Sequence, residues 1–71
     1  MNDNRYYHIM LIPSEGDAKE PRLAFRDPEQ AAGAAERFAR VEFPGQKVEI
    51  VVIETKTREA VINRFVEPSK E

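Results

Sequence analysis

One segment carries both the start and the stop signals of a helix, and it limits what the rest of the chain can be: DPEQAAGAAERFARVEFPG, residues 27–45. Asp27 is a capping residue, Pro28 suits the first helical position, and Gln30 completes a D-x-x-Q version of the capping box. The Pro-Gly pair that closes the segment disfavours helical geometry and allows the chain to reverse. We therefore predict a helix that ends near Glu42.

The inward face of this helix is small. The residues at i, i+3, i+4 and i+7 spacing are mostly alanine: Ala31, Ala34, Ala35, Phe38 and Val41. Such a face lies close against a sheet but contributes little apolar area. The strands must therefore supply most of the core.

Two segments have the composition of strands that are apolar on both faces. Residues 6–12 read YYHIMLI, and residues 48–53 read VEIVVI. In the first, Tyr7, Ile9 and Leu11 alternate with His8, Met10 and Ile12. A single alanine-rich helix covers only one face of the sheet, so the other face requires a different cover.

Two further segments complete the predicted sheet. Arg22–Arg26, RLAFR, is short and flanked by arginines, which suits an edge strand. Ala60–Val66 has strand composition and would form a hairpin through TKTR, although that turn lacks Gly, Asn or Asp. The alternative is a short helix capped by Thr57, which would cover the second sheet face. We favour the strand, which leaves that face open to another chain.

The sequence thus predicts an α+β fold in a single small domain over residues 1–71. Its antiparallel sheet has three to four strands in ββαββ order, and one helix packs on one face. The C-terminal segment is a strand or a short helix. We expect residues 1–4 and 67–71 to be disordered.

Length and charge restrict the classes of function. A chain of 71 residues builds a hydrophobic core that is only marginally sufficient for stability. The absence of cysteine removes disulfides and thiolate zinc sites. Oligomerisation is therefore the remaining means of stabilisation. Thirteen acidic residues against eleven basic ones give no excess of positive charge for nucleic acid. No segment resembles a signal peptide or a membrane span. We expect a cytoplasmic protein with no membrane partner.

No catalytic constellation emerges from the sequence. His8 is the only histidine, and Ser14 stands six residues further on, near the opposite end of the strand, which is a poor geometry for a nucleophile and its base. Glu15, Asp17 and Glu20 lack the ligand spacing of an EF-hand, and a solvated acidic loop explains them, while cation binding by loop 13–21 stays open. We expect no enzyme activity, no cofactor and no metal.

The uncovered sheet face is the candidate interaction surface. The residues that we assign to it, with the outward side of the helix, are Tyr6, His8, Met10, Ile12, Arg37 and Arg40. An exposed apolar patch of this kind usually marks an interface, so we predict a protein-binding module and a homodimer. The alternative is a single-stranded nucleic-acid-binding protein that uses tyrosines and arginines on the sheet face.

The arrangement also resembles a group of small free-standing bacterial and phage proteins. The similarity is carried by the D-P-E-x-A helix start (Asp27, Pro28, Glu29, Ala31), by F-P-G at residues 43–45, and by strand Val48–Ile53. Some anti-CRISPR and other phage host-takeover proteins share this ββαβ(β) plan. The resemblance implies a stoichiometric inhibitor that binds a host protein complex, and it transfers no site residue.

Overall fold

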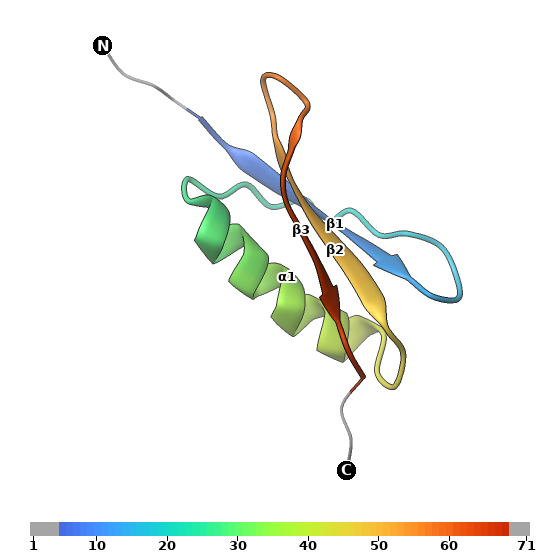
Figure 1. The fold of residues 1–71 in the computed structure, drawn as a ribbon. Coiled ribbons are helices and arrows are strands. Elements are labelled where there is room, and N and C mark those ends of the chain that lie inside the picture. The colour runs from blue at the N-terminus through green and yellow to red at the C-terminus, as the bar shows by residue number, and fades with distance from the viewer. Residues whose placement is uncertain (1–4, 69–71) are drawn as a thin grey trace.

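The computed structural model of the chain describes residues 5–68, and it contains one helix packed on one face of a three-stranded antiparallel sheet (Figure 1). In chain order the elements are β1 (Tyr7–Pro13), α1 (Pro28–Glu42), β2 (Val48–Glu54) and β3 (Ala60–Val66). The strands lie in the order β1-β2-β3. The predicted α+β class is confirmed. The disorder predicted for residues 1–4 and 69–71 lies outside the described residues.

Helix α1 begins and ends where the local signals predict. The Asp27 carboxylate accepts a hydrogen bond from the backbone N–H of Glu29 at 3.0 Å, which caps the first turn. At the other end the Phe43 N–H donates to the Ala39 carbonyl at 2.9 Å. Gly45 then reverses the chain with a φ of +81°, in the left-handed region that glycine adopts without strain.

The predicted inward face of α1 is wrong at its C-terminal end. Val41 is 73% exposed, whereas all the buried positions of the helix are alanines: Ala31, Ala32, Ala34, Ala35 and Ala39. The row at i, i+4 and i+8 from Ala31 to Ala39 rests on the sheet, because its small side chains allow close approach. Val41 follows Ala39 by two residues, about 200° around the helix, so it points away from the sheet.

The strands supply the larger core side chains, as expected. Alternate residues of β1 and β2 are completely buried beneath α1: Ile9, Leu11, Ile50 and Val52. Leu11 lies opposite Ile50, and Ile9 lies opposite Val52 in the β1–β2 register. Alternation places their neighbours on the opposite face of the sheet.

The C-terminal segment is a strand, and the helical alternative is wrong. Its hairpin turn is organised by Glu54 in place of a glycine or asparagine. The carboxylate accepts from the Thr57 hydroxyl at 2.7 Å, the Thr57 N–H at 3.1 Å and the Lys56 N–H at 3.3 Å. Arg58 adopts the left-handed backbone conformation that the turn needs, with a φ of +64°. The hydrogen bond from the Thr57 hydroxyl lowers the pKa of Glu54, although burial opposes this effect.

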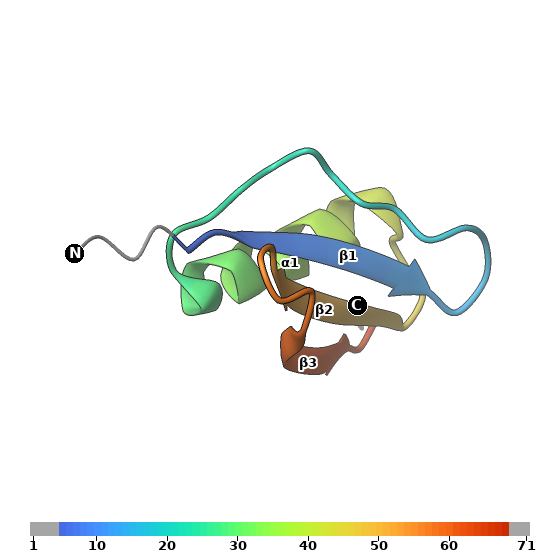
Figure 2. The same cartoon turned by 90° about the horizontal axis from the view of Figure 1, so that it is seen from above.

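The strand predicted at Arg22–Arg26 does not form. The chain instead runs along the outer edge of β1 and touches it by two isolated bridges (Figure 2). Tyr7 exchanges backbone hydrogen bonds with Phe25 at 2.8 and 3.0 Å, and Leu11 does the same with Lys19 at 2.8 Å each. This segment covers the β1 edge without becoming a fourth strand.

A proline explains the interruption. From one bridge to the other, the segment advances six positions, from Lys19 to Phe25, where β1 advances four, so it must bow outward from the edge. Pro21 has no N–H to give to a ladder, and its carbonyl accepts from the Leu23 N–H at 2.9 Å in a tight local turn. The composition of RLAFR therefore favours a strand that the preceding proline prevents.

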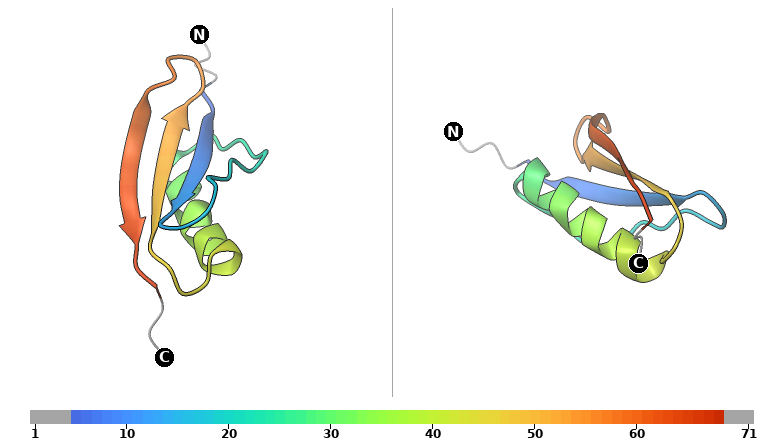
Figure 3. Two further views of the ribbon diagram at one scale, coloured as in Figure 1. Left: turned by 90° about the vertical axis from the view of Figure 1, so that its right-hand side faces the viewer. Right: turned by 60° about the horizontal axis from the view of Figure 1, so that its bottom comes forward.

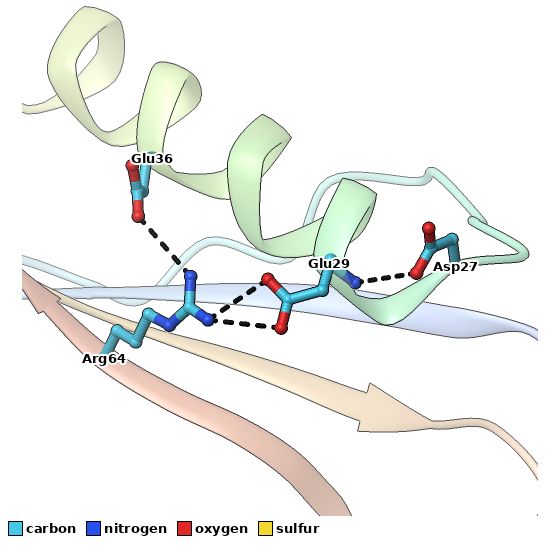
Figure 4. Close-up of polar contacts among 4 residues, drawn as sticks. All are labelled: Asp27, Glu29, Glu36 and Arg64. Atoms are coloured by element: carbon cyan, nitrogen blue, oxygen red, sulfur yellow. Dashed lines mark hydrogen bonds and ion pairs between the residues drawn. The ribbon is translucent and has the colours of Figure 1, made fainter.

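Strand β3 is tied to the helix by one arginine (Figure 4). The Arg64 guanidinium lies 3.2 and 3.3 Å from the two carboxylate oxygens of Glu29 and 3.8 Å from Glu36. Arg64 stands opposite Ile50 on the helix-covered face. These groups are solvent-exposed, so each pair contributes little stability, but their charges are mutually satisfied.

Candidate functional site

The sheet face opposite α1 is the candidate site, and we call it the bare face. It comprises nine side chains from three strands: His8, Met10, Ile12, Glu49, Val51, Ile53, Val61, Asn63 and Phe65. Figure 3 (left) shows the strands in front of α1, with no other helix or strand in front of them. Among residues 5–68, no element covers this face.

The bare face is apolar at its centre and along β3. Met10 lies opposite Val51, and Ile53 stands one step along β2; all three are half-buried by their neighbours in the sheet. On β3, Val61 is 47% exposed and Phe65 is 57% exposed. We call these apolar side chains on three strands the apolar strip, and exposed apolar surface of this kind marks an interface in a folded protein.

Polar groups interrupt this strip at defined places. Glu49 on the central strand accepts a hydrogen bond from the Asn63 side-chain amide at 2.8 Å. The Lys47 ammonium lies 4.8 Å from the centre of the Phe65 ring. The charges on and beside the face are thus balanced rather than uniformly positive.

A hollow opens where the bare face meets the edge of β1. One part, of about 420 Å³, is lined by His8, Met10, Glu20, Ile53, Thr55 and Arg58. An adjoining part, of about 510 Å³, shares His8 and Glu20 and extends over the segment from Pro21 to Ala24. We call the two together the His8 hollow. Its lining combines apolar side chains, among them Met10 and Ile53, with the charged residues Glu20, Arg22 and Arg58.

The orientation of His8 follows from a single contact. Its Nδ1 atom lies 3.2 Å from the Leu23 carbonyl oxygen. Because a carbonyl oxygen only accepts, this contact places a hydrogen on Nδ1. Ser14 is engaged elsewhere, since its hydroxyl donates to the Gln46 side-chain oxygen at 3.1 Å. The structure does not bring these two residues together.

Of the remaining predicted surface residues, Arg37 and Arg40 lie apart from the bare face, whereas Tyr6 directly precedes the first residue of β1. Tyr6 precedes β1 and is 39% exposed, and the Arg26 guanidinium lies 5.3 Å from the centre of its ring. Arg37 and Arg40 are exposed on α1, on the other layer of the molecule. Of the predicted set, His8, Met10 and Ile12 share one surface.

A second hollow, of about 320 Å³, lies between α1 and the segment along β1. Its floor is formed by Leu11 and Phe38. Of its three charged lining residues, Lys19 and Glu42 are paired with each other at 2.7 Å, and Glu20 also lines the His8 hollow. It therefore offers a partner fewer unsatisfied polar groups than the His8 hollow.

Loop 13–21 contains the acidic residues Glu15, Asp17 and Glu20 that were considered above for cation binding. Within residues 5–68, no three His, Asp or Glu side chains lie close enough together to hold a metal ion. The same part of the chain contains no helix with the length and apolar character needed to cross a bilayer.

Sequence reasoning missed several residues of the site. The alternation of VEIVVI already separates Val51 and Ile53 from the buried set, so it could have placed them beside Met10. Phe65 and Arg58 could not be placed in the same way. The position of Phe65 depends on the hairpin register, and that of Arg58 depends on the left-handed turn. No local sequence motif predicts either feature.

Comparisons of the chain with protein-family models, with curated proteins and with solved structures found no match. The function must therefore be argued from the site alone.

Proposed function

We propose that this chain is a small non-enzymatic binding module that docks another protein on its bare face. The observation that carries the proposal is the apolar strip centred on Met10, Val51 and Ile53, on the sheet face opposite α1. A partner that covered this strip would remove apolar surface from water, which is the dominant favourable term in most protein association. The His8 hollow would receive a projecting side chain of that partner.

The charge pattern favours a protein over a nucleic acid. Glu49 stands on the central strand of the bare face, and Phe65 is the only phenylalanine, tyrosine or tryptophan on it. Single-strand binding surfaces combine several stacking aromatics with a positive groove. The resemblance noted above would make the partner part of a host protein complex, blocked by a phage or mobile-element inhibitor.

Affinity capture with matched variants tests the proposal. The baits are the wild type, Val51→Glu on the bare face and Val41→Glu on the outward side of α1, all used on lysate of the source cells after nuclease treatment. We expect the wild type and V41E to retain one stoichiometric protein. V51E should lose it by about tenfold or more, because a glutamate there would be buried unpaired in the interface.

Two results would count against the proposal. Equal capture by V51E and the wild type, with both variants folded by circular dichroism, would remove the bare face from the interaction. A parallel capture from untreated lysate that falls steeply with salt, and that is lost after nuclease treatment, would point instead to nucleic acid.

A further inference from the structure

The two outer edges of the sheet differ in whether another segment of the chain is hydrogen-bonded to them. The outward backbone groups of Tyr7 and Leu11 on β1 are hydrogen-bonded to Phe25 and Lys19. Strand β3 is the opposite end of the sheet, and no segment of residues 5–68 lies beyond it (Figure 3, left). One edge is covered and the other is open.

Ladder alternation identifies the groups that the open edge presents. In an antiparallel sheet, the backbone groups of successive residues point alternately to one neighbour and to the other. Because Leu11 bonds outward to Lys19, its partner Ile50 bonds away from β1, toward Arg64. The alternate residues of β3 therefore direct their N–H and C=O groups outward: Val61, Asn63 and Phe65.

Strand β3 lacks the usual protection of an edge. Open edges in natural proteins carry lysine, proline or inward-pointing charges that prevent pairing with another chain. Residues Ala60–Val66 contain no lysine and no proline. The one charge, on Arg64, lies on the helix side and is matched by Glu29 and Glu36. The bulge at the start of the strand leaves Ile62–Val66 regular.

We propose that β3 pairs antiparallel with β3 of a second copy, about a two-fold axis at Asn63. The pairing would double the three-stranded sheet and supply on the order of six new backbone hydrogen bonds. It goes beyond the proposed function, because it uses the edge of the sheet and leaves the centre of each bare face free.

Within Ala60–Val66, the side chains favour this register. With the axis at Asn63, the exposed Val61 of each copy lies opposite the exposed Phe65 of the other, on the bare side of the joined sheet. An axis at Arg64 would place two like charges opposite each other. An axis at Ile62 would place each Phe65 opposite Glu59 of the hairpin loop and leave it without an apolar partner.

A charge-reversal pair tests both the edge and the register by sedimentation equilibrium. We expect wild-type protein at about twice the monomer mass of 8.2 kDa. V61E/F65E places glutamate opposite glutamate and should raise the dissociation constant of the dimer at least about tenfold. V61K/F65E places lysine opposite glutamate, and its dissociation constant should be about tenfold lower than that of V61E/F65E. V41E, an exposed apolar-to-glutamate change on α1, should leave the dimer unchanged.

Three sedimentation results would overturn the inference. They are a wild type that stays monomeric at millimolar concentration, a V61E/F65E variant that dimerises as tightly as the wild type, and a V61K/F65E variant that dimerises no more tightly than V61E/F65E. Hydrogen exchange on the wild type supplies a measurement that needs no variant. The amides of Asn63 and Phe65 should be protected in concentrated protein and exchange faster on dilution. Fast exchange of both at all concentrations would exclude pairing at this edge.

Discussion

Gly33 lies in α1 at a position where neither backbone conformation nor packing requires a glycine. It lies inside the helix, and a Cβ built there would meet only the Arg37 guanidinium, at an ordinary contact distance of 3.8 Å. Glycine inside a helix costs about 1 kcal/mol relative to alanine. We predict that Gly33→Ala raises the free energy of unfolding by about 1 kcal/mol and the Tm by about 4–8 °C, as measured by thermal denaturation.

Gly45 supplies the matched control for this substitution. Its φ of +81° is unfavourable for any residue with a Cβ, although open space surrounds it. Gly45→Ala should therefore lower the free energy of unfolding by about 1–2 kcal/mol. If both changes shifted the Tm in the same direction, backbone conformation would not explain the difference between the two glycines.

Single residues also show where pattern reading works. The period-two alternation of YYHIMLI separates Ile9 and Leu11 from His8, Met10 and Ile12, as the structure has them. Val41 was misplaced because a hydrophobic pattern favours the bulkiest apolar residue for the core. The helix instead turns its smallest side chains to the sheet, since close approach buries more of the strands.

At the scale of elements, the β2–β3 hairpin is held by a carboxylate whose pKa is lowered. Glu54 is only 5% exposed and accepts three hydrogen bonds within its own turn. A carboxyl group with a lowered folded pKa stabilises the fold above its unfolded pKa, and this stabilisation is lost as the pH falls through the folded pKa. The hairpin should therefore weaken in acid.

Glu54→Gln tests this dependence. We predict that the variant unfolds at lower urea concentration than the wild type at pH 7, and that the gap narrows as the pH falls below about 4.3, the unperturbed value for glutamate. Glu59→Gln, in the same loop and exposed, is the control and should show no such gap. A gap that widens toward acid would contradict the lowered pKa of Glu54.

Elements with local signals could be predicted, and those set by distant pairing could not. The bounds of α1 follow from Asp27 and from the Pro-Gly pair that closes its segment. The RLAFR segment has strand composition, yet Pro21 and the bowed path between two bridges keep it from joining β1 as a strand. The β2–β3 turn contains no typical turn residue, so its geometry depends on the Glu54 side chain.

At the scale of the whole molecule, the balance between apolar strands and helical cover decides what the surface can do. β1 and β2 are apolar on both faces, and α1 covers only one face of the sheet that they form. This excess was evident from the sequence, and it predicted an uncovered face before any residue could be placed on it. The structure adds the His8 hollow and the open β3 edge, which depend on register and on the path of the chain.

Site-specific photo-crosslinking tests the proposed use of the bare face most directly. An aliphatic diazirine residue replaces Val51 on the bare face or, as the control, Val41 on the outward side of α1, and the protein is irradiated in lysate of the source cells. We predict a discrete adduct with a different protein from position 51 and none from position 41. Adducts from position 41 alone, or no adduct from position 51, would contradict a binding role for the bare face.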